Sequence, residues 1–266
     1  MLFMQKARLD HKYIVVTGGT SGLGLAMASA LLREGATVAI SARPGSRLAA
    51  CVADLRNQGY QAEALPMDVR DPDSVRSAAQ EIGSRWPRLD MVINNAGIGM
   101  RTVNLDFLQS PQPFFNVSPR QFDDVIATNL TGYFLVSREF FSLFEKQNAG
   151  RFLNISMNHE TMVCQGFVPY GPSRAGAEAL SYIMAKDLEP FGVTVNILLP
   201  GGAVKTGMIP ENVQESVRSR LLDPEIMGPP VVFLASDEAK GITGERITAT
   251  LWHEWCRSHG IVPRDS

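Results

Sequence analysis

The sequence predicts a single α/β domain, doubly wound around a parallel sheet of about seven strands. Short β-branched runs alternate with helical, apolar-periodic segments along nearly all of the 266 residues. A glycine-rich turn joins the first of these strands to the first helix. No linker, repeat or change of composition divides the chain, so residues 1–266 are expected to form one domain.

The first unit is a strand, a glycine turn, a helix and a second strand. The strands are expected at 13–17 and 37–41, and the helix at 25–33, with Gly18 to Gly24 as the turn between them. In a parallel crossover unit of this kind, the helix N-terminus faces a pyrophosphate group. The unit therefore favours a dinucleotide site; the alternative is a tight turn that binds nothing.

The same alternation continues to the end of the chain. Further strands are expected at 61–66, 90–93, 151–156, 193–199 and 246–251, and helices at 47–58, 72–85, 119–146, from 170 onwards, at 211–222 and at 229–236. Ligands of such sheets bind beyond the carboxyl ends of the strands. Those ends carry Gly18, Arg43, Asp68, Asn94, Ser156 and Pro200.

Composition and charge narrow the function classes. The formal net charge is −2 and no basic run occurs, which argues against a nucleic-acid binder. The three cysteines show no paired metal spacing, the histidines form no metal-binding group with carboxylates, and the cysteine usage is that of a reduced, cytoplasmic protein. The first twelve residues lack a signal-peptide core, and no apolar run reaches the roughly 18 residues of a membrane span. We expect a soluble cytoplasmic protein that uses no metal.

Tyr170 and Arg174 open a long helix and lie one turn apart on the same face. A phenol normally ionises near pH 10, and an adjacent fixed cation favours the phenolate, which brings such a group within reach of acid–base chemistry. The alternative is a pair of surface residues that form only structural hydrogen bonds.

Taken together, the motifs resemble the short-chain dehydrogenase/reductase family over nearly the whole chain. They are Thr17-Gly18-x-x-x-Gly22-x-Gly24, Asp68-Val69, Asn94-Asn95-Ala96-Gly97, Asn129, Tyr170-x-x-x-Arg174, Asn196-x-x-x-Pro200-Gly201 and Thr206. The resemblance implies a Rossmann-type fold, a nicotinamide cofactor and hydride transfer centred on a tyrosine. It also implies homodimers or homotetramers built on the long helices that follow Pro119 and Tyr170.

The resemblance also implies roles for individual residues. Tyr170 is the acid for carbonyl reduction or the base for alcohol oxidation, and Asn94 lines the cofactor floor, unless Asn94 only joins strands. Asp68 holds the adenine edge, unless it is a helix cap. The predicted catalytic set is Tyr170, Arg174, Asn129, Ser156 and His159, and the predicted cofactor-binding set is Gly18, Thr20, Ser21, Gly22, Leu23, Gly24, Arg43, Asp68, Val69, Asn95, Ala96, Gly97, Tyr170, Arg174, Pro200, Gly201 and Thr206.

Cofactor choice depends on the end of the second strand. A carboxylate there binds the ribose 2′-hydroxyl of NAD. This chain instead has Ser41-Ala42-Arg43, followed by Arg47. No carboxylate repels a 2′-phosphate, and a guanidinium can bind one bidentately. We expect NADP(H), with NAD(H) still possible if Arg43 only stacks on adenine.

Two positions depart from the family pattern. Met157 stands where the family has a serine that donates a hydrogen bond to the substrate oxygen, and Arg174 stands where it has a lysine. Ser156 directly precedes Met157 but faces the opposite side of the strand unless the backbone bulges. Asn158 and His159 are therefore the candidate replacement donors, with His159 preferred; the alternative is a polar turn that is merely structural. Arg174 keeps the positive charge but does not release a proton at accessible pH.

Two segments have no counterpart in the pattern. An aromatic insertion at 106–115 is expected to cover the substrate side of the cleft or to pack on a neighbouring subunit. Trp252 and Trp255 are expected to line the pocket or, preferably, an interface. The leading hypothesis is an NADP(H)-dependent oxidoreductase of a moderately apolar ketone or secondary alcohol. The alternatives are a cofactor-binding but redox-silent sensor or scaffold, and a non-redox lyase or dehydratase that uses Tyr170.

Overall fold

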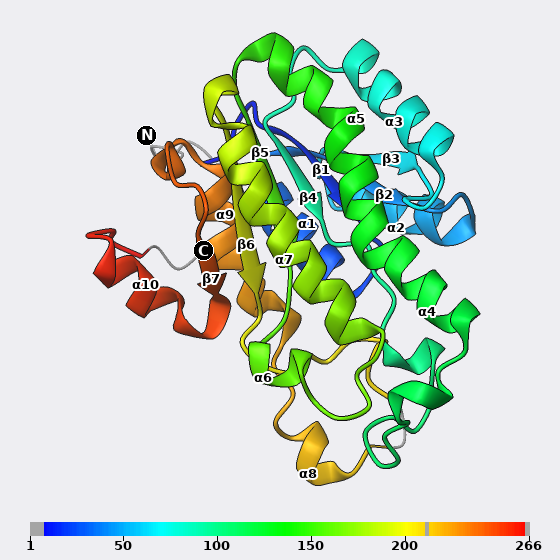
Figure 1. The fold of residues 1–266 in the computed structure, drawn as a ribbon. Helices are drawn as coiled ribbons and strands as arrows, with labels where there is room; N and C mark the ends of the chain where they lie inside the picture. Colours follow the sequence, from blue (N-terminus) through cyan, green and yellow to red (C-terminus); the bar gives the residue numbers. More distant parts are fainter. Residues whose placement is uncertain (1–7, 211–212, 264–266) are drawn as a thin grey trace.

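The computed structural model describes residues 8–210 and 213–263, which form one doubly wound α/β domain (Figure 1). In this part of the chain seven parallel strands form one sheet, in the order β3-β2-β1-β4-β5-β6-β7. This confirms the predicted fold class and sheet. The strands are β1 Tyr13–Thr17, β2 Thr37–Ala42, β3 Ala62–Pro66, β4 Met91–Asn94, β5 Gly150–Ile155, β6 Val193–Leu199 and β7 Arg246–Thr248.

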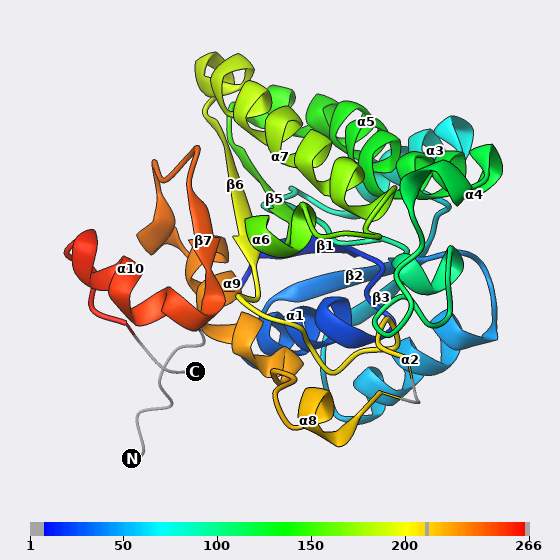
Figure 2. The same cartoon turned by 60° about the horizontal axis from the view of Figure 1, so that its bottom comes forward.

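Helices cover both faces of the sheet (Figure 2). One face carries α3 Pro72–Arg85, α4 Pro119–Ile126, α5 Gly132–Gln147 and α7 Tyr170–Asp187, and the other carries α1 Gly22–Arg33, α2 Ser46–Asn57 and α9 Gly228–Ala235. The short helices are α6 His159–Met162, α8 Glu215–Arg218 and α10 Trp252–Ser258.

Each face of the sheet has its own hydrophobic core, because successive strand residues point to opposite sides. In β1, Ile14 and Val16 pack into the core under α1, α2 and α9, whereas Val15 packs into the core under α3, α5 and α7. Both cores are made largely of fully buried aliphatic side chains. The strands are therefore covered on both faces, as near-continuous apolar runs in a parallel sheet predict.

Three elements differ from the sequence-based expectation. The helix expected at 119–146 is divided by a π-helical turn at Ala127–Thr131, which separates α4 from α5. The helix expected at 211–222 is confined to Glu215–Arg218, and residues 211–212 lie outside the described residues. The last strand ends at Thr248 instead of residue 251, and a short 3₁₀ turn leads into α10.

The two tryptophans of α10 belong to the core of their own chain. Trp252 is buried and packs on Phe233 of α9, with the ring centroids 5.2 Å apart. Trp255 stacks on Trp252 and donates a hydrogen bond from Nε1 to Glu245 at 3.2 Å. The expectation that they line the pocket or an interface was therefore wrong for Trp252, which α9 already covers.

The order of the strands in the sheet reverses direction between β1 and β4. In sheets of this kind, ligands bind at the carboxyl ends of the strands next to such a reversal. The crossovers from β1 and β4 leave on opposite faces, which opens a crevice at the carboxyl ends of these strands. Among the described residues, no helix combines the length and apolar character needed to cross a membrane.

Candidate active site

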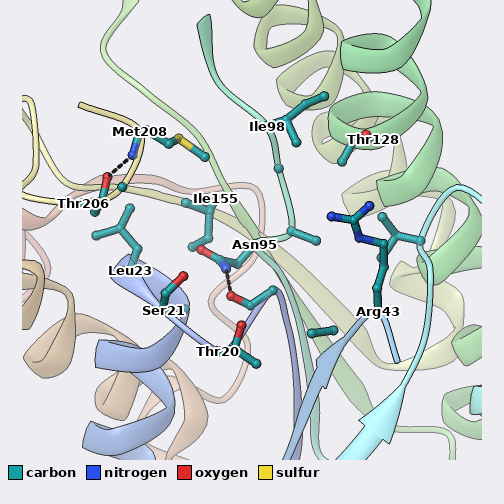
Figure 3. Close-up of a pocket in the computed structure, with 18 of the residues that line it drawn as sticks. Thr20, Ser21, Leu23, Arg43, Asn95, Ile98, Thr128, Ile155, Thr206 and Met208 are labelled. Carbon is teal, nitrogen blue, oxygen red and sulfur yellow. Dashed lines mark hydrogen bonds between the residues drawn. The ribbon is translucent and has the colours of Figure 1, made fainter. Parts of the chain in front are cut away.

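A pocket of about 660 Å³ lies in this crevice (Figure 3). Figure 3 shows the turn from Thr20 to Leu23 on one side of it and Arg43 on the other. Most of the predicted cofactor residues line it, and they come from turns and strand ends far apart in the sequence. They are Gly18, Thr20, Ser21, Gly22, Leu23, Gly24, Arg43, Asp68, Val69, Asn95, Ala96, Gly97, Tyr170, Arg174 and Thr206.

The glycine turn brings bare backbone to the pocket. Gly18 and Gly22 have φ values of +64° and +55°, in the left-handed region that glycine adopts without strain. Ser21, the N-cap of α1, forms no side-chain cap hydrogen bond. The amide groups of the first turn of α1 therefore face the pocket without a side-chain partner, and with the helix dipole they can bind an anion.

Gly24 is required by close packing. A Cβ atom at this position would lie 2.3 Å from the carbonyl oxygen of Gly18 and 2.4 Å from Nδ2 of Asn95. We expect Gly24→Ala to lower the free energy of unfolding by about 1–3 kcal/mol, because backbone must shift to accept the methyl group. Denaturant unfolding measures this change. Gly207→Ala is the matched control, since a Cβ there meets nothing within 4 Å; equal effects of the two substitutions would contradict the packing argument.

The loop after β4 is held against the end of β1. Thr17 Oγ1 accepts hydrogen bonds from the backbone amides of Asn95 and Ala96, at 2.9 and 3.0 Å. The side chain of Asn95 donates in return to the carbonyl oxygen of Thr17 at 2.8 Å. Asn94 is fully buried and donates to Asn154 of β5 at 2.8 Å, so it joins strands and does not line the pocket.

Positively charged side chains gather at the β2 and β3 end of the pocket. Arg43 and Arg47 are exposed, line the pocket and form no ion pair with any residue that the structure describes. Asp68 is bound by Arg70 through two hydrogen bonds, Nε–Oδ1 at 3.1 Å and Nη2–Oδ2 at 2.8 Å. These hydrogen bonds hold the pKa of Asp68 below its usual value. The local charge therefore comes mainly from Arg43 and Arg47.

At the opposite end, Tyr170 lines the pocket and Arg174 lies behind it. The guanidinium carbon of Arg174 is 5.2 Å from the centre of the Tyr170 ring. Arg174 is only 3% exposed. Burial opposes its charge, but the neighbouring Tyr133 and Tyr170 phenols outweigh burial and raise the pKa of Arg174. A permanent cation thus lies next to the tyrosine.

Nη2 of Arg174 lies close to Gly97, in the loop after β4. A Cβ atom at Gly97 would lie 2.5 Å from Nη2 of Arg174 and 3.1 Å from Oδ1 of Asn129. Asn129, in the π-helical turn, is fully buried and does not line the pocket. Its side chain accepts a hydrogen bond from the Ile98 amide at 2.9 Å and donates to the Ile98 carbonyl at 3.0 Å, which fixes this loop.

The candidate substrate-oxygen donors lie in different environments. Ser156 lines the pocket, and its hydroxyl donates to Oε1 of Glu178 at 2.5 Å. Glu178 is also bound by Nε of Arg246 at 3.0 Å. Met157 is half-buried and His159 is exposed at the start of α6; neither lines the pocket.

The turn after β6 closes the pocket on its third side. Thr206 and Met208 line it, whereas Pro200 and Gly201 do not. Gly201 has φ +96° and its carbonyl oxygen accepts a hydrogen bond from Asn158 at 3.0 Å. Of the three residues predicted to contact the cofactor in this turn, only Thr206 therefore borders the pocket.

The aromatic insertion is divided between interior and surface. Phe107 packs edge-to-face on Phe167, with the centroids 5.8 Å apart, in a small core that Tyr170 joins. Phe114 and Phe115 are exposed and contact each other. Phe107 is therefore buried in this small core, whereas the other two rings are exposed, and no residue from 106 to 115 lines the pocket. That the insertion covers the substrate side or packs on a neighbouring subunit stays a prediction.

The sequence analysis missed the residues that hold site side chains in place but lie outside the recognised motifs. Arg70, Tyr133 and Glu178 contact predicted site residues, and Arg246 in turn contacts Glu178, yet all four lie outside the motifs. Only Arg70, two residues after Asp68, was within reach of a local argument. Among the described residues, no group of three or more His, Cys, Asp or Glu side chains is arranged to hold a metal ion.

The sequence is similar to a known family and to characterised proteins. Residues 12–216 match the family model described as short chain dehydrogenase. The chain is 32% identical over 248 residues to the 3-oxoacyl-(acyl-carrier-protein) reductase FabG of Aquifex aeolicus, covering 90% of this chain and 96% of that protein. It is 30% identical over 251 residues to the cyclopentanol dehydrogenase of Comamonas testosteroni, with the same two coverages.

The fold is similar to solved structures. A dehydrogenase/reductase from Sinorhizobium meliloti 1021 superposes with a TM-score of 0.78 at 30% identity, covering 91% of this chain and 95% of that one. A protein from Beutenbergia cavernae, provisionally assigned as an NAD(P)-dependent gluconate 5-dehydrogenase and holding NADP at low occupancy, superposes with a TM-score of 0.81 at 27% identity. It covers 94% of this chain and 100% of its own length.

Proposed function

Because the chain belongs to the short-chain dehydrogenase family of NAD(P)-dependent oxidoreductases, we propose that it transfers a hydride between NADP(H) and a ketone or secondary alcohol. Tyr170 is the acid or base of this reaction. The observation that carries the proposal is the position of Tyr170, which lines the pocket with the buried Arg174 cation 5.2 Å from its ring centre.

The residues present fit a dinucleotide. The Gly18 and Gly24 positions admit no side chain, so backbone amides border the pyrophosphate end. Nε of Arg174 is buried without a hydrogen-bond partner in the described structure, which suits a ligand acceptor at the end of the pocket where Tyr170 lies. Arg43 and Arg47, without ion-pair partners, suit a 2′-phosphate better than an unmodified ribose. These features support NADP(H) over NAD(H).

The chemistry divides between cofactor and protein. When bound, the nicotinamide supplies or accepts the hydride. In the reduction direction the Tyr170 hydroxyl donates a proton to the substrate oxygen, and in the oxidation direction its phenolate accepts one. Arg174 stabilises the negative charge on the phenol oxygen after proton donation. Ile98, Thr102 and Met208 border the space next to Tyr170, where the substrate is proposed to bind.

We propose Ser156 as the donor that replaces the family serine. A rotation of its side chain frees the hydroxyl, and Glu178 then keeps its hydrogen bonds from Arg246. Ser156→Ala is expected to lower kcat by about 10²–10³, the usual cost of one oxyanion donor. His159→Ala is expected to leave kcat unchanged, because the imidazole is exposed and outside the pocket. Steady-state kinetics on both variants checks this, and a large loss in the His159 variant would assign the donor there instead.

Incubation with NADPH and a panel of aliphatic and cyclic ketones tests the proposed function. Loss of NADPH absorbance with formation of the alcohol supports it. Cofactor binding without hydride transfer to any ketone would favour a redox-silent sensor or scaffold. Conversion of a substrate without net consumption of cofactor would favour a lyase or dehydratase that uses Tyr170. The two alternatives therefore give different results in one experiment.

We also propose a homo-oligomer, dimer or tetramer, built on the outer faces of α4, α5 and α7. Phe122, Phe134 and Ile183 are exposed there. Exposed apolar side chains gathered on neighbouring helices are typical of an interface. Ile183→Glu is expected to shift the mass measured by light scattering to that of the monomer. Val262→Glu, at an exposed apolar residue near the C-terminus, is the control that keeps the oligomer mass.

A further inference from the structure

The guanidinium of Arg174 is anchored at one end only. Its Nη1 donates to the hydroxyl of Tyr133 at 2.7 Å and to the carbonyl oxygen of Ile155 at 2.9 Å. Nε has no partner, and no described carboxylate forms an ion pair with this cation. A fully buried charge held by two neutral acceptors is an uncommon arrangement, because a buried cation normally has an anionic partner.

The hydroxyl of Tyr133 connects Arg174 to the end of β5. Tyr133 lies in the first turn of α5 and is 2% exposed. Its hydroxyl donates to the carbonyl oxygen of Ile155 at 3.2 Å while accepting from Arg174. Burial raises the pKa of Tyr133 even though Arg174 opposes this effect, so the phenol stays neutral and remains a hydrogen-bond acceptor for the guanidinium.

The contacts of Nη1 with Tyr133 and Ile155 determine how the guanidinium is oriented, because its other nitrogens remain available as donors. A lysine ammonium is one compact charge, whereas arginine presents a planar fork with donors on both sides. Fixing Nη1 between α5 and the end of β5 leaves Nη2 beside Gly97 and Nε as the remaining donors. Arg174 lines the pocket and its Nη1 is taken by the two acceptors, so Nε and Nη2 are the donors that remain for a ligand.

We propose that Tyr133 is a positioning residue that holds Arg174 by its rear nitrogen, so that the other guanidinium donors face the cofactor. The inference rests on the proposed function in one respect, namely that the pocket binds NADP(H). It predicts that Tyr133 contributes to cofactor affinity only while residue 174 is an arginine. A lysine at 174 has no second nitrogen for Tyr133 to hold.

A double-mutant cycle tests this coupling. NADPH dissociation constants are measured by fluorescence titration for the wild type, Tyr133→Phe, Arg174→Lys and the double variant. We expect Tyr133→Phe to weaken NADPH binding about tenfold in the Arg174 background, equivalent to about 1.4 kcal/mol. In the Arg174→Lys background we expect the same substitution to have no effect. Tyr182→Phe, on the outer face of α7, is the matched control and keeps wild-type affinity.

The outcomes separate this inference from the proposed function. An equal loss of affinity in both backgrounds, or none in either, overturns the role of Tyr133 even if the wild type reduces ketones. Coupled losses of affinity support the inference even if the wild type transfers no hydride, in which case only the proposed reaction fails. A wild type that binds no nicotinamide cofactor overturns both.

Folding provides a second measurement. Thermal midpoints are recorded for all four proteins without cofactor. If Tyr133→Phe folds only together with Arg174→Lys, the pairing of the two residues is supported directly, because Tyr133→Phe removes one of the two acceptors of the buried guanidinium. If Tyr133→Phe fails to fold in either background, its role is purely structural and the inference is wrong.

Discussion

Tyr170→Phe is expected to lower kcat for ketone reduction by about 10²–10⁴, the range that general acid catalysis contributes. The substitution removes the only atom of Tyr170 that can deliver a proton to the substrate oxygen. The ring itself stays in the small core with Phe107 and Phe167, so the pocket should keep its shape. Steady-state kinetics with NADPH gives kcat, and fluorescence titration gives the dissociation constant of NADPH, which we expect to be unchanged.

The matched control for this prediction is Tyr182→Phe, which removes the same hydroxyl from the same helix. Tyr182 is 38% exposed on the outer face of α7 and does not line the pocket. Its variant should keep wild-type kcat. If Tyr170→Phe retained wild-type kcat as well, proton transfer would have to come from another group, and the proposed role of Tyr170 would be wrong.

Arg43→Ala is expected to lower kcat/KM with NADPH roughly tenfold to hundredfold, because a hydrogen bond to a charged group contributes about 1.5–3 kcal/mol. Arg43 lies at the end of β2 on the pocket wall opposite the glycine turn (Figure 3). With NADH, which lacks the 2′-phosphate, the same substitution should leave kcat/KM unchanged. The ratio of the two values, measured for wild type and variant, gives the contribution of Arg43 to cofactor selectivity.

Arg257→Ala serves as the control for charge alone, since it removes an exposed guanidinium of α10 that does not line the pocket. Its selectivity ratio should equal that of the wild type. A parallel loss with NADPH and NADH in Arg43→Ala would instead indicate that Arg43 stacks on the adenine, which is common to the two cofactors. That result would remove the main support for NADP(H).

Much of the fold was predictable from sequence because local signals and tertiary packing agree. The strand runs at 13–17 and 193–199 were correct to the residue, since buried parallel strands are continuous apolar segments with clear breaks. The start of α1 was placed three residues late, at 25 instead of Gly22. Glycine is a poor helix former, and here packing against Gly18 overrides that preference.

The π-helical turn shows why some features escaped prediction. A single extra residue in a turn changes the register of the helix without changing its composition, so apolar residues on both sides still fall near helical spacing. The insertion was also ambiguous, because Phe107 and Phe114 have the same side chain yet opposite burial. Only tertiary contacts determine where a helix changes register and which of two identical side chains is buried.

The parts of the candidate site that the sheet topology positions could be predicted from the sequence. The hydrogen-bond partners of its side chains could not. The predicted strand ends correctly placed Arg43, Asp68 and Ser156 at one pocket. The sequence could not reveal that Ser156 turns toward Glu178, or that Tyr133 reaches Arg174 across 41 positions of the chain. Those contacts depend on how α5 and α7 pack on β5.

The crowding around Gly97 links the residues that positions 97 and 174 can hold. A methyl group there would lie 2.5 Å from Nη2 of Arg174, so the guanidinium would have to shift to accept a side chain at residue 97. A lysine at 174 lacks this branch and would remove that contact, although the methyl group would still lie 3.1 Å from Oδ1 of Asn129. The residue at 174 therefore changes how tightly position 97 is restricted to glycine: more tightly with an arginine than with a lysine.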